Sequence, residues 1–447
     1  MFAVHLTAQW AAWVADLAAP LHRRCAWRLA HVVAGILMAS GRRTASSWWR
    51  AAGVGTAFRS YYYFLDAIGR KAIEVATVLV GLLDRHLDSD DRWLLALDDT
   101  PTKRYGPEVQ GAGVHHNPTP GPAGSKFLYG HSWVVLSRIV HHHQGGVVGL
   151  PLLGRLYIRA KDIPDLPDEI EWAFRTKPQL AAELITWAAD RLGGTGRRPW
   201  VAVDGAYCNR EFLKPAKRAG VTVVARLRRD ADLNDLPPPL RPGQKRGRGR
   251  PPIYGKGPVS LAKRAGQRRG WQPVRASTIR GREVIRMAKS FLATWRPAGG
   301  TIRVVIVEEP DGEWRAYLCT DPGASVESIV QAIHDRWAIE QGFADLKEVE
   351  GIEQVQVRRV WSNVGALNLN LWVHTLVEAW AWGRPAEEVR DRRDRPWDDP
   401  ERRPSHADRR KALQREMVEE EFRRVRLPLP WSEKIRPLLE GVVRMVA

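Results

Sequence analysis

Apolar residues follow a helical spacing from residue 1 to about residue 90, in short segments separated by Gly and basic residues. Arg stands beside aromatic residues in several of them, as in SGRRTASSWWRAAG and AFRSYYYFLDAIGRKA. Short helices of this composition are typical of small DNA-binding domains, and equally of a helical cap packed on the rest of a protein. The pattern predicts a helical N-terminal region over 1–90 and leaves both roles open.

Short apolar runs of strand type replace this pattern from residue 93 onward. Together with the helical segments between them they give the order β-β-β-α-β-α-β, which predicts an α/β domain with a mixed sheet. The predicted strands are 93–97, 132–140, 146–153, 200–203 and 221–227, and the predicted helices are 179–192 and 210–220. We expect the first part of this domain to span 91–229.

A Pro-, Gly- and Arg-rich stretch, PPPLRPGQKRGRGRPPIYGKG, interrupts the domain. The runs VIRMAKSFLATW, TIRVVIVEE and EWRAYLCT that follow it predict a β-rich insertion over 230–324. Ser325 is the predicted N-cap of a long helix, which opens the second part of the domain, 325–375. Many Arg, Asp and Glu in 376–447 predict a charged C-terminal region that is helical and solvated or partly disordered.

The chain of 447 residues is strongly basic, with 69 Lys and Arg against 50 Asp and Glu and a net charge of +19. This charge predicts a polyanionic partner. Cys25, Cys208 and Cys319 are too few and too scattered for a disulfide framework or a thiolate zinc site, which fits a reducing cytosol. No apolar run approaches the roughly 20 residues of a transmembrane helix, so we expect no membrane association.

Acidic residues directly follow two of the predicted buried strands. WLLAL runs into Asp98 and Asp99, and WVAV runs into Asp204 and then Gly205. In open α/β sheets, ligands and catalytic groups collect in the crevice beyond the carboxyl ends of the strands. For either strand alone, an Asp in this place is commonly a turn former or a helix N-cap.

A third acid, Glu340, stands within the helix predicted after Ser325. A helical projection places it in an apolar stripe formed by Val326, Ile329, Val330, Ile333, Trp337 and Ala344. Because an unpaired ionised carboxylate is costly to bury, Glu340 must pair with a cation, bind a metal or face a cleft. Arg336, four residues earlier, offers an exposed ion pair as the simplest account.

Convergence of these acids on one site favours a metal. Carboxylates that lie close together repel one another, and Mg²⁺ relieves this repulsion by taking their oxygens as ligands. Two such ions roughly 3.5–4 Å apart serve both the attacking and the leaving oxygen of a phosphoryl transfer. In a chain of charge +19, the phosphate is expected to belong to nucleic acid.

At these residues the sequence resembles the DDE transposases of bacterial insertion sequences. One subgroup carries Tyr, two residues, Arg, three residues, Glu, six residues and Lys, and IHDRWAIEQGFADLK keeps this spacing with Ile333 in the tyrosine place. The resemblance covers 91–375. It implies an α/β, ribonuclease-H-like mixed sheet with a β-rich insertion, flanked by helical N- and C-terminal regions, of which 1–90 would bind DNA.

The family's motifs also imply roles for single residues. LDDTP assigns the first catalytic aspartate to Asp99, with Asp98 as the alternative, and VDGAYCNREFL assigns the second to Asp204. The same motif makes Arg210 a candidate phosphate contact. In GEWRAYLCTDP, Trp314 corresponds to a tryptophan that stacks on a flipped base in some members. Because the chain has 20 tryptophans, a position in the hydrophobic core is the alternative for Trp314.

Further DNA contacts are predicted on the glutamate helix and in the basic loop. Arg336, Glu340 and Lys347 fall within about 40° of one another around the helix axis, so that one face offers a metal ligand between two cations. QKRGRGRPP resembles a minor-groove arm through Arg248 and Arg250, for which we favour phosphate contact over base reading.

The function that the resemblance implies is a DNA transposase that cleaves the inverted-repeat ends of an insertion sequence and joins the 3′-hydroxyl ends to target DNA. Asp99, Asp204 and Glu340 would hold two Mg²⁺ ions, for which Mn²⁺ can substitute. Double-stranded DNA is the expected partner, a homodimer on DNA the expected assembly, and the bacterial cytoplasm beside the nucleoid the expected location. The alternatives are a ribonuclease-H-fold nuclease without strand transfer and an inactive, transposase-derived DNA-binding regulator.

Overall fold

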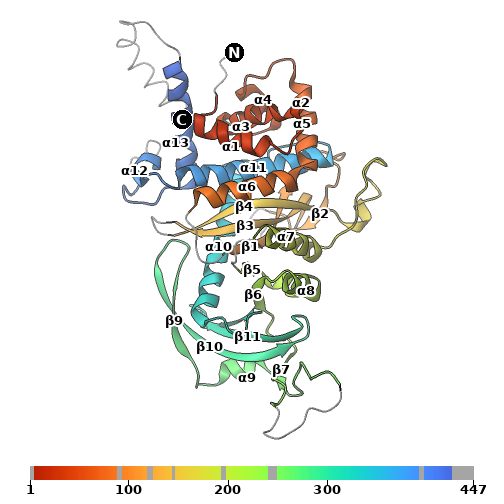
Figure 1. The fold of residues 1–447 in the computed structure, drawn as a ribbon, viewed down its shortest axis with the longest axis vertical. Helices are drawn as coiled ribbons and strands as arrows, with labels where there is room; N and C mark the ends of the chain where they lie inside the picture. Colours follow the sequence, from red (N-terminus) through yellow and green to blue (C-terminus); the bar gives the residue numbers. More distant parts are fainter. Residues whose placement is uncertain are drawn as a thin grey trace.

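The computed structural model describes residues 5–87, 93–117, 124–142, 146–192, 198–239, 249–391 and 397–424. Figure 1 shows three parts along the long axis: N-terminal helices at one end, a sheet with helices in the middle, and a curved β-rich part at the other end. Among the described residues, no helix is both long and apolar enough to cross a membrane.

The N-terminal region consists of helices that pack onto the rest of the protein. They are α1 (Ala8–Ala18), α2 (Arg23–Ala26), α3 (Arg28–Met38), α4 (Ala45–Ala51), α5 (Phe58–Arg70) and α6 (Ala72–His86). Glycines let α5 approach the long helix α11 (Val360–Ala381) closely, since a Cβ on Gly69 would lie 2.0 Å from the Trp361 carbonyl oxygen. This region therefore packs as a helical cap, and its role in DNA binding stays a prediction.

The central sheet has the predicted order of elements. Its strands are β1 (Leu94–Lys103), β3 (Phe127–His141), β4 (Val147–Tyr157), β5 (Trp200–Val203) and β6 (Thr222–Leu227), joined by helices α7 (Lys177–Leu192) and α8 (Arg210–Arg218). β1 pairs antiparallel with β3 and parallel with β5, and β5 pairs parallel with β6. The mixed α/β fold expected from the sequence is confirmed. A short strand that the sequence reading missed, β2 (Gly113–His116), pairs with β3.

The β-rich insertion extends this sheet. Its long strands are β9 (Gln272–Ser277), β10 (Glu283–Trp295), β11 (Gly300–Glu308) and β12 (Trp314–Cys319), and its short elements are β7 (Leu233–Asn234), β8 (Pro258–Val259) and α9 (Leu261–Gly266). β12 pairs antiparallel with β6, so the insertion is bonded to the edge of the central sheet. Figure 1 shows β10 and β11 curving away from the helices at the lower end.

The long helix α10 (Val326–Glu348) crosses the sheet, and the Ser325 hydroxyl caps it by accepting a hydrogen bond from the Ser328 N–H at 3.1 Å, as predicted. The predicted apolar stripe is wrong, because Trp337 on that stripe is 47% exposed. The helix instead packs closely on β4 at Ala338, where a Cβ on Gly149 would lie 2.9 Å from the Ala338 carbonyl oxygen. The face it buries carries Ile329, Val330, Ala338, Ile339, Phe343 and Leu346.

The C-terminal region contains α12 (Ala386–Val389) and α13 (His406–Arg424). Its sequence predicted a solvated tail, and for α13 this is wrong. Leu413 and Met417 are fully buried there, and the charged His406, Arg409 and Arg410 are also buried. These charges are tolerated inside the protein because buried carboxylates of other elements neutralise them.

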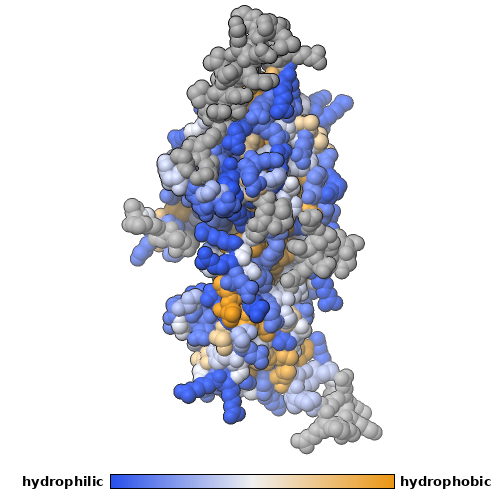
Figure 2. All heavy atoms as spheres, turned by 90° about the vertical axis from the view of Figure 1, so that its left-hand side faces the viewer, coloured by the Kyte–Doolittle hydropathy of each residue, from blue (hydrophilic) through white to orange (hydrophobic). Residues whose placement is uncertain are grey.

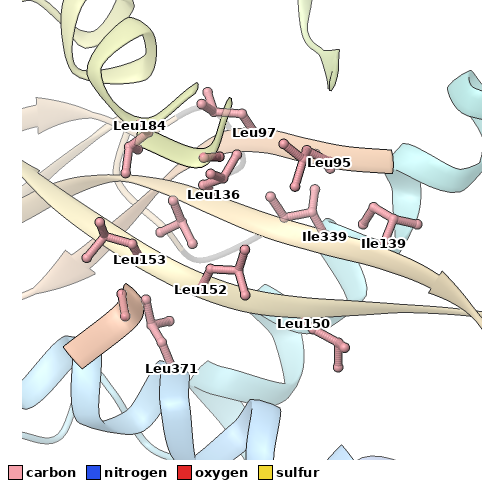
Figure 3. Packing of buried hydrophobic residues seen from close by; sticks show 14 of the residues in the cluster. Leu95, Leu97, Leu136, Ile139, Leu150, Leu152, Leu153, Leu184, Ile339 and Leu371 are labelled. Carbon is pink, nitrogen blue, oxygen red and sulfur yellow. The ribbon is translucent and has the colours of Figure 1, made fainter. Parts of the chain in front are cut away.

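Leucine-rich strands form the centre of the core. Figure 3 shows leucines of β1, β3 and β4 packed with Leu184 of α7, Ile339 of α10 and Leu371 of α11. The surface differs between the two ends: Figure 2 shows a mostly hydrophilic upper half, whereas apolar side chains gather in the lower half. The core thus holds α10, which carries Glu340, against the sheet that carries Asp98 and Asp204.

Candidate active site

The register of the parallel strands brings Asp98 and Asp204 together. Leu97 of β1 is paired with Val203 of β5, and each is followed by an aspartate. In-register residues of neighbouring parallel strands lie about 4.8 Å apart and point to the same face. Asp98, within β1, and Asp204, directly after β5, therefore stand side by side at the edge of the sheet where β5 ends. The predicted strand 93–97 ends too early, because β1 continues to Lys103 through its pairing with β3.

Arg336 of α10 connects this edge to Glu340. Its guanidinium donates to Asp98 Oδ2 at 2.8 Å and to Glu340 Oε1 at 2.9 Å. The Arg336 side chain is 15% exposed, that of Asp98 20% and that of Glu340 40%. The ion pair between Arg336 and Glu340 thus belongs to a partly buried cluster rather than to an exposed helix surface. Glu340 itself lies at the border of the buried face of α10 and remains accessible to solvent.

Asp99 points to the opposite face of β1, because successive residues of a strand alternate. Its Oδ2 accepts a hydrogen bond from Lys177 Nζ at 2.5 Å, and its Oδ1 accepts one from the Tyr207 hydroxyl at 3.3 Å. Figure 1 shows α7, which begins at Lys177, and α10 on different sides of β1 and β5. The geometry therefore favours Asp98 as the partner of Asp204 and Glu340, in place of Asp99, which the sequence had favoured.

The electrostatics of this edge suit a divalent cation. Burial raises the pKa of Asp98 to about 6; Arg336 acts against this shift, whereas the neighbouring charges of Asp99 and Asp204 add to it. The carboxylate oxygens of Asp98, Asp204 and Glu340 are the hard ligands that Mg²⁺ and Mn²⁺ take. A divalent cation would offset the burial and the smaller charge repulsion that disfavour the ionised form of Asp98.

The predicted Trp314 lies beside Asp204. Both line one open pocket at the ends of β6 and β12, together with Arg226. The Trp314 ring is half-buried, and the guanidinium of Arg229 lies 4.8 Å from its centre. Trp314 is thus a surface residue near the carboxylates and not a core tryptophan.

The other predicted DNA contacts are spread more widely. Lys347 is half-buried near Glu353 and Lys103, and burial lowers its pKa, which Glu353 partly counteracts. Arg210 and Arg250 line a different hollow beside α8. Arg248 lies outside the described residues. The structure therefore joins Arg336 directly to the carboxylates and leaves the remaining cations around them.

Sequence reasoning missed Lys177 and Tyr207, which hold Asp99. The Tyr207 hydroxyl is buried, and burial and the nearby Asp99 and Asp98 raise its pKa well above the ordinary value, so it remains a hydrogen-bond donor. A usable signal was present for Tyr207, because it stands in the VDGAYCNREFL motif. Lys177 is far from the motif residues in sequence and carried no signal.

A second cluster of charged residues is fully buried away from this edge. His406 Nδ1 lies 2.7 Å from Glu378 Oε1, and His406 Nε2 lies 2.9 Å from Glu350 Oε1. Arg409 pairs with Glu378, and Arg410 pairs with Glu350. We call these five residues the buried ionic network.

Two residues of this network and the neighbouring His374 have the composition of a metal site, because His374, Glu378 and His406 offer ligand atoms within 4.8 Å of one another. The two imidazole rings are stacked, with centroids 3.9 Å apart and planes inclined by 26°. Stacked rings aim their nitrogens in parallel rather than at a common point, and Arg409 already neutralises Glu378. An ionic network therefore accounts for these residues better than a metal does.

Comparison with known proteins places the chain in a family. It belongs to the DDE superfamily endonucleases, whose family model matches residues 16–284, more than half of the chain. The matched range contains Asp98, Asp99 and Asp204 and ends before Glu340. Among curated proteins no match was found.

One similar solved structure is a piggyBac transposase synaptic complex with hairpin DNA, at 11% sequence identity and a TM-score of 0.33. The match covers 79% of this chain and 57% of that one, so the chain spans little more than half the length of that protein. This likeness is too distant to support an argument about the site. The family therefore rests on the family model, and the site on the geometry described above.

Proposed function

We propose that this DDE endonuclease is a DNA transposase, which cleaves the inverted-repeat ends of an insertion sequence and transfers the 3′-hydroxyl ends to target DNA. The observation that carries the proposal is the pairing of Leu97 with Val203, which sets Asp98 beside Asp204 at the sheet edge that Arg336 links to Glu340. The net charge of +19 supports DNA as the substrate.

Asp98, Asp204 and Glu340 are the proposed metal ligands, with Asp98 taking the role first assigned to Asp99. Two Mg²⁺ ions, or Mn²⁺ in their place, would polarise the phosphate and increase the acidity of the attacking hydroxyl. The side chain of Arg336 lies between two of the carboxylates and keeps its charge throughout. Its proposed role is to orient Asp98 and Glu340 and to contact a phosphate oxygen.

The proposed reaction consists of two displacements at phosphorus. Water first attacks the phosphate at the element end; a P–O bond forms, the bond to the 3′ oxygen breaks, and the released 3′ oxygen takes up a proton. That 3′-hydroxyl then attacks a phosphate of target DNA, and an equal number of bonds forms and breaks. Neither displacement needs an external energy source or a covalent enzyme intermediate.

The proposal also gives roles to further residues, to the N-terminal helices and to the assembly. Trp314, which lines the pocket of Asp204, is proposed to stack on an unpaired base. Lys347 on the same helix as Glu340 is proposed to contact phosphate. The helices of 1–90 are proposed to contact the element ends, and a homodimer to hold two ends together.

Strand transfer tests the proposal. A labelled, pre-cleaved duplex taken from the DNA that flanks the coding region is incubated with target plasmid and Mg²⁺. We expect joined product, and we expect Glu340→Gln and Asp204→Asn to lower its rate on the order of 10³-fold, since each removes a metal ligand. Glu327→Gln is the matched control, because Glu327 is an exposed glutamate in the first turn of the same helix.

The outcomes separate the candidate functions. Cleavage without joining indicates a nuclease, and DNA binding without either reaction indicates an inactive regulator. Unchanged joining by Glu340→Gln or Asp204→Asn would show that the metal ligands lie elsewhere.

A further inference from the structure

Six basic side chains line one concave surface beside α8. The hollow has a volume of about 810 Å³, and no Asp or Glu is among its lining residues. Its cations are Arg210, Lys214, Lys217, Arg218, Arg250 and Arg296. We call this the α8 surface. It joins two residues predicted separately as DNA contacts, Arg210 and Arg250, which lie far apart in the sequence.

The cations of the α8 surface lack acidic partners. Among the described residues, none of the six forms an ion pair with a carboxylate, and all but Lys214 are exposed. The pocket of Asp204 differs, because its Arg228 and Arg229 pair with Asp230 and Glu313. Charge of one sign, gathered without compensation, favours a bound anion.

Two contacts hold the surface in shape. Lys217 Nζ donates a hydrogen bond to the Gly299 carbonyl oxygen at 2.9 Å, which ties α8 to the turn between β10 and β11. The guanidinium of Arg296 lies 5.9 Å from the centre of the Tyr254 ring. The cations therefore stand on a connected framework of the helix, the turn and the insertion.

The position of the surface relates it to the proposed active site. α8 begins at Arg210, shortly after Asp204 at the carboxyl end of β5. It ends at Arg218, and β6 then starts beside the amino end of β5. The turn at Gly299 lies toward the same end of the sheet. It joins β10 to β11 where Trp295 pairs with Gly300, whereas Trp314, beside Asp204, pairs with the far end of β11. The surface thus leads away from the end of β5 that Asp204 follows, on the α7 side of the sheet, opposite to α10.

We propose that the α8 surface binds the phosphate backbone of the duplex DNA that leads away from the cleavage site. The inference rests on the proposed function and adds a second contact area, remote from the carboxylates. Point charges on flexible side chains contact phosphates without reading bases. Six of them along a helix and a turn match an extended polyanion rather than a single phosphate group, which fewer donors would satisfy.

Salt-dependent DNA binding tests this inference. The full chain carrying Glu340→Gln, so that DNA is not cleaved, is titrated with a labelled random-sequence duplex of about 40 bp at several salt concentrations. Adding Arg218→Ala and Arg250→Ala removes two proposed phosphate contacts. We expect binding to weaken on the order of tenfold and the slope of log K against log salt to fall by about 1.8, that is about 0.9 per contact.

The control removes the same charge elsewhere, through Arg268→Ala and Arg269→Ala, two exposed arginines outside the surface. In this control, the slope of log K against log salt is expected to stay within about 0.5 of the parent's slope. That is less than the change of about 0.9 expected for the loss of one phosphate contact. Equal losses in both variants, or no change in the first while the parent binds DNA, would overturn the inference and leave the proposed function intact. A parent that binds no duplex at all would overturn the proposed function itself.

Discussion

Two groups of carboxylates lie near the helix α10, and they differ in what neutralises them. Asp98 and Glu340 share one cation, Arg336, and Asp204 stands beside them. In the buried ionic network, Glu350 and Glu378 share three basic residues: Arg409, Arg410 and His406. The first group has more carboxylates than cations, whereas each glutamate of the second group pairs with an arginine and with His406.

Burial differs in the same direction. The side chains of Glu350 and Glu378 are 0% and 3% exposed, whereas that of Glu340 is 40% exposed. Buried carboxylates with their own cations hold helices together, and carboxylates left open and short of charge can take a metal and a phosphate. The number of neighbouring cations and the burial thus distinguish a cluster suited to stabilising the fold from one suited to binding a metal.

The largest effect is expected from the two neighbouring aspartates of β1. Asp98→Asn should lower the rate of DNA cleavage on the order of 10³-fold, because it removes a proposed metal ligand beside Asp204. Asp99→Asn should lower it only about tenfold, since it weakens the bonds to Lys177 and Tyr207 and changes no ligand. Single-turnover cleavage in Mg²⁺ measures both. The reverse order would restore Asp99 as the ligand.

The next largest effect concerns stability. Arg410→Met should lower the free energy of unfolding by about 3–5 kcal/mol, because it leaves the buried, charged Glu350 with His406 as its only ion-pair partner among the described residues. Denaturant unfolding measures this change, and Arg336→Met, at the more open cluster, is the matched comparison with an expected loss below about 2 kcal/mol. Similar losses for the two variants would contradict the contrast between the clusters.

The smallest effect is a dependence of stability on pH. Burial alone would lower the pKa of His406, but its hydrogen bonds to Glu350 and Glu378 raise it to about 9. Because the folded state holds this proton more tightly than the unfolded state, the stabilisation is full below about pH 6.5 and is lost as the pH rises through about 9.

His406→Gln should therefore be less stable than the wild type at pH 7 by about 2 kcal/mol, and the difference should shrink toward pH 10. Thermal unfolding across pH 6–10 measures it. A difference that stays constant with pH would mean that His406 is not the group that titrates.

Much of the fold could be predicted because the strands are bounded by clear changes of pattern. WVAV was predicted as a strand over 200–203, and β5 has the same bounds. The burial of α10 was not predictable from periodicity, because the helix packs closely on Gly149 at Ala338, and Gly149 is distant in sequence. A tertiary contact decided which face is buried.

The site was predictable only in part for a similar reason. Asp98 and Asp99 are adjacent, and the choice between them depends on which strand face meets α10, a tertiary contact seen in the hydrogen bond from Arg336 to Asp98. The buried ionic network was missed because its residues stand in segments that are either strongly apolar or strongly charged. Glu378 falls within LNLNLWVHTLVEAWAW, where the apolar residues dominated the prediction.

The pairing of β12 with β6 has a consequence for the independence of the catalytic sheet. Along their paired residues, the backbone groups of β6 that face outward are bonded to the insertion, from Leu227 opposite Ala316 to Val224 opposite Cys319. Without the insertion these groups would form an open, apolar strand edge, which readily pairs with other chains and aggregates. The insertion therefore also covers an edge through which the central sheet would otherwise be open to self-association.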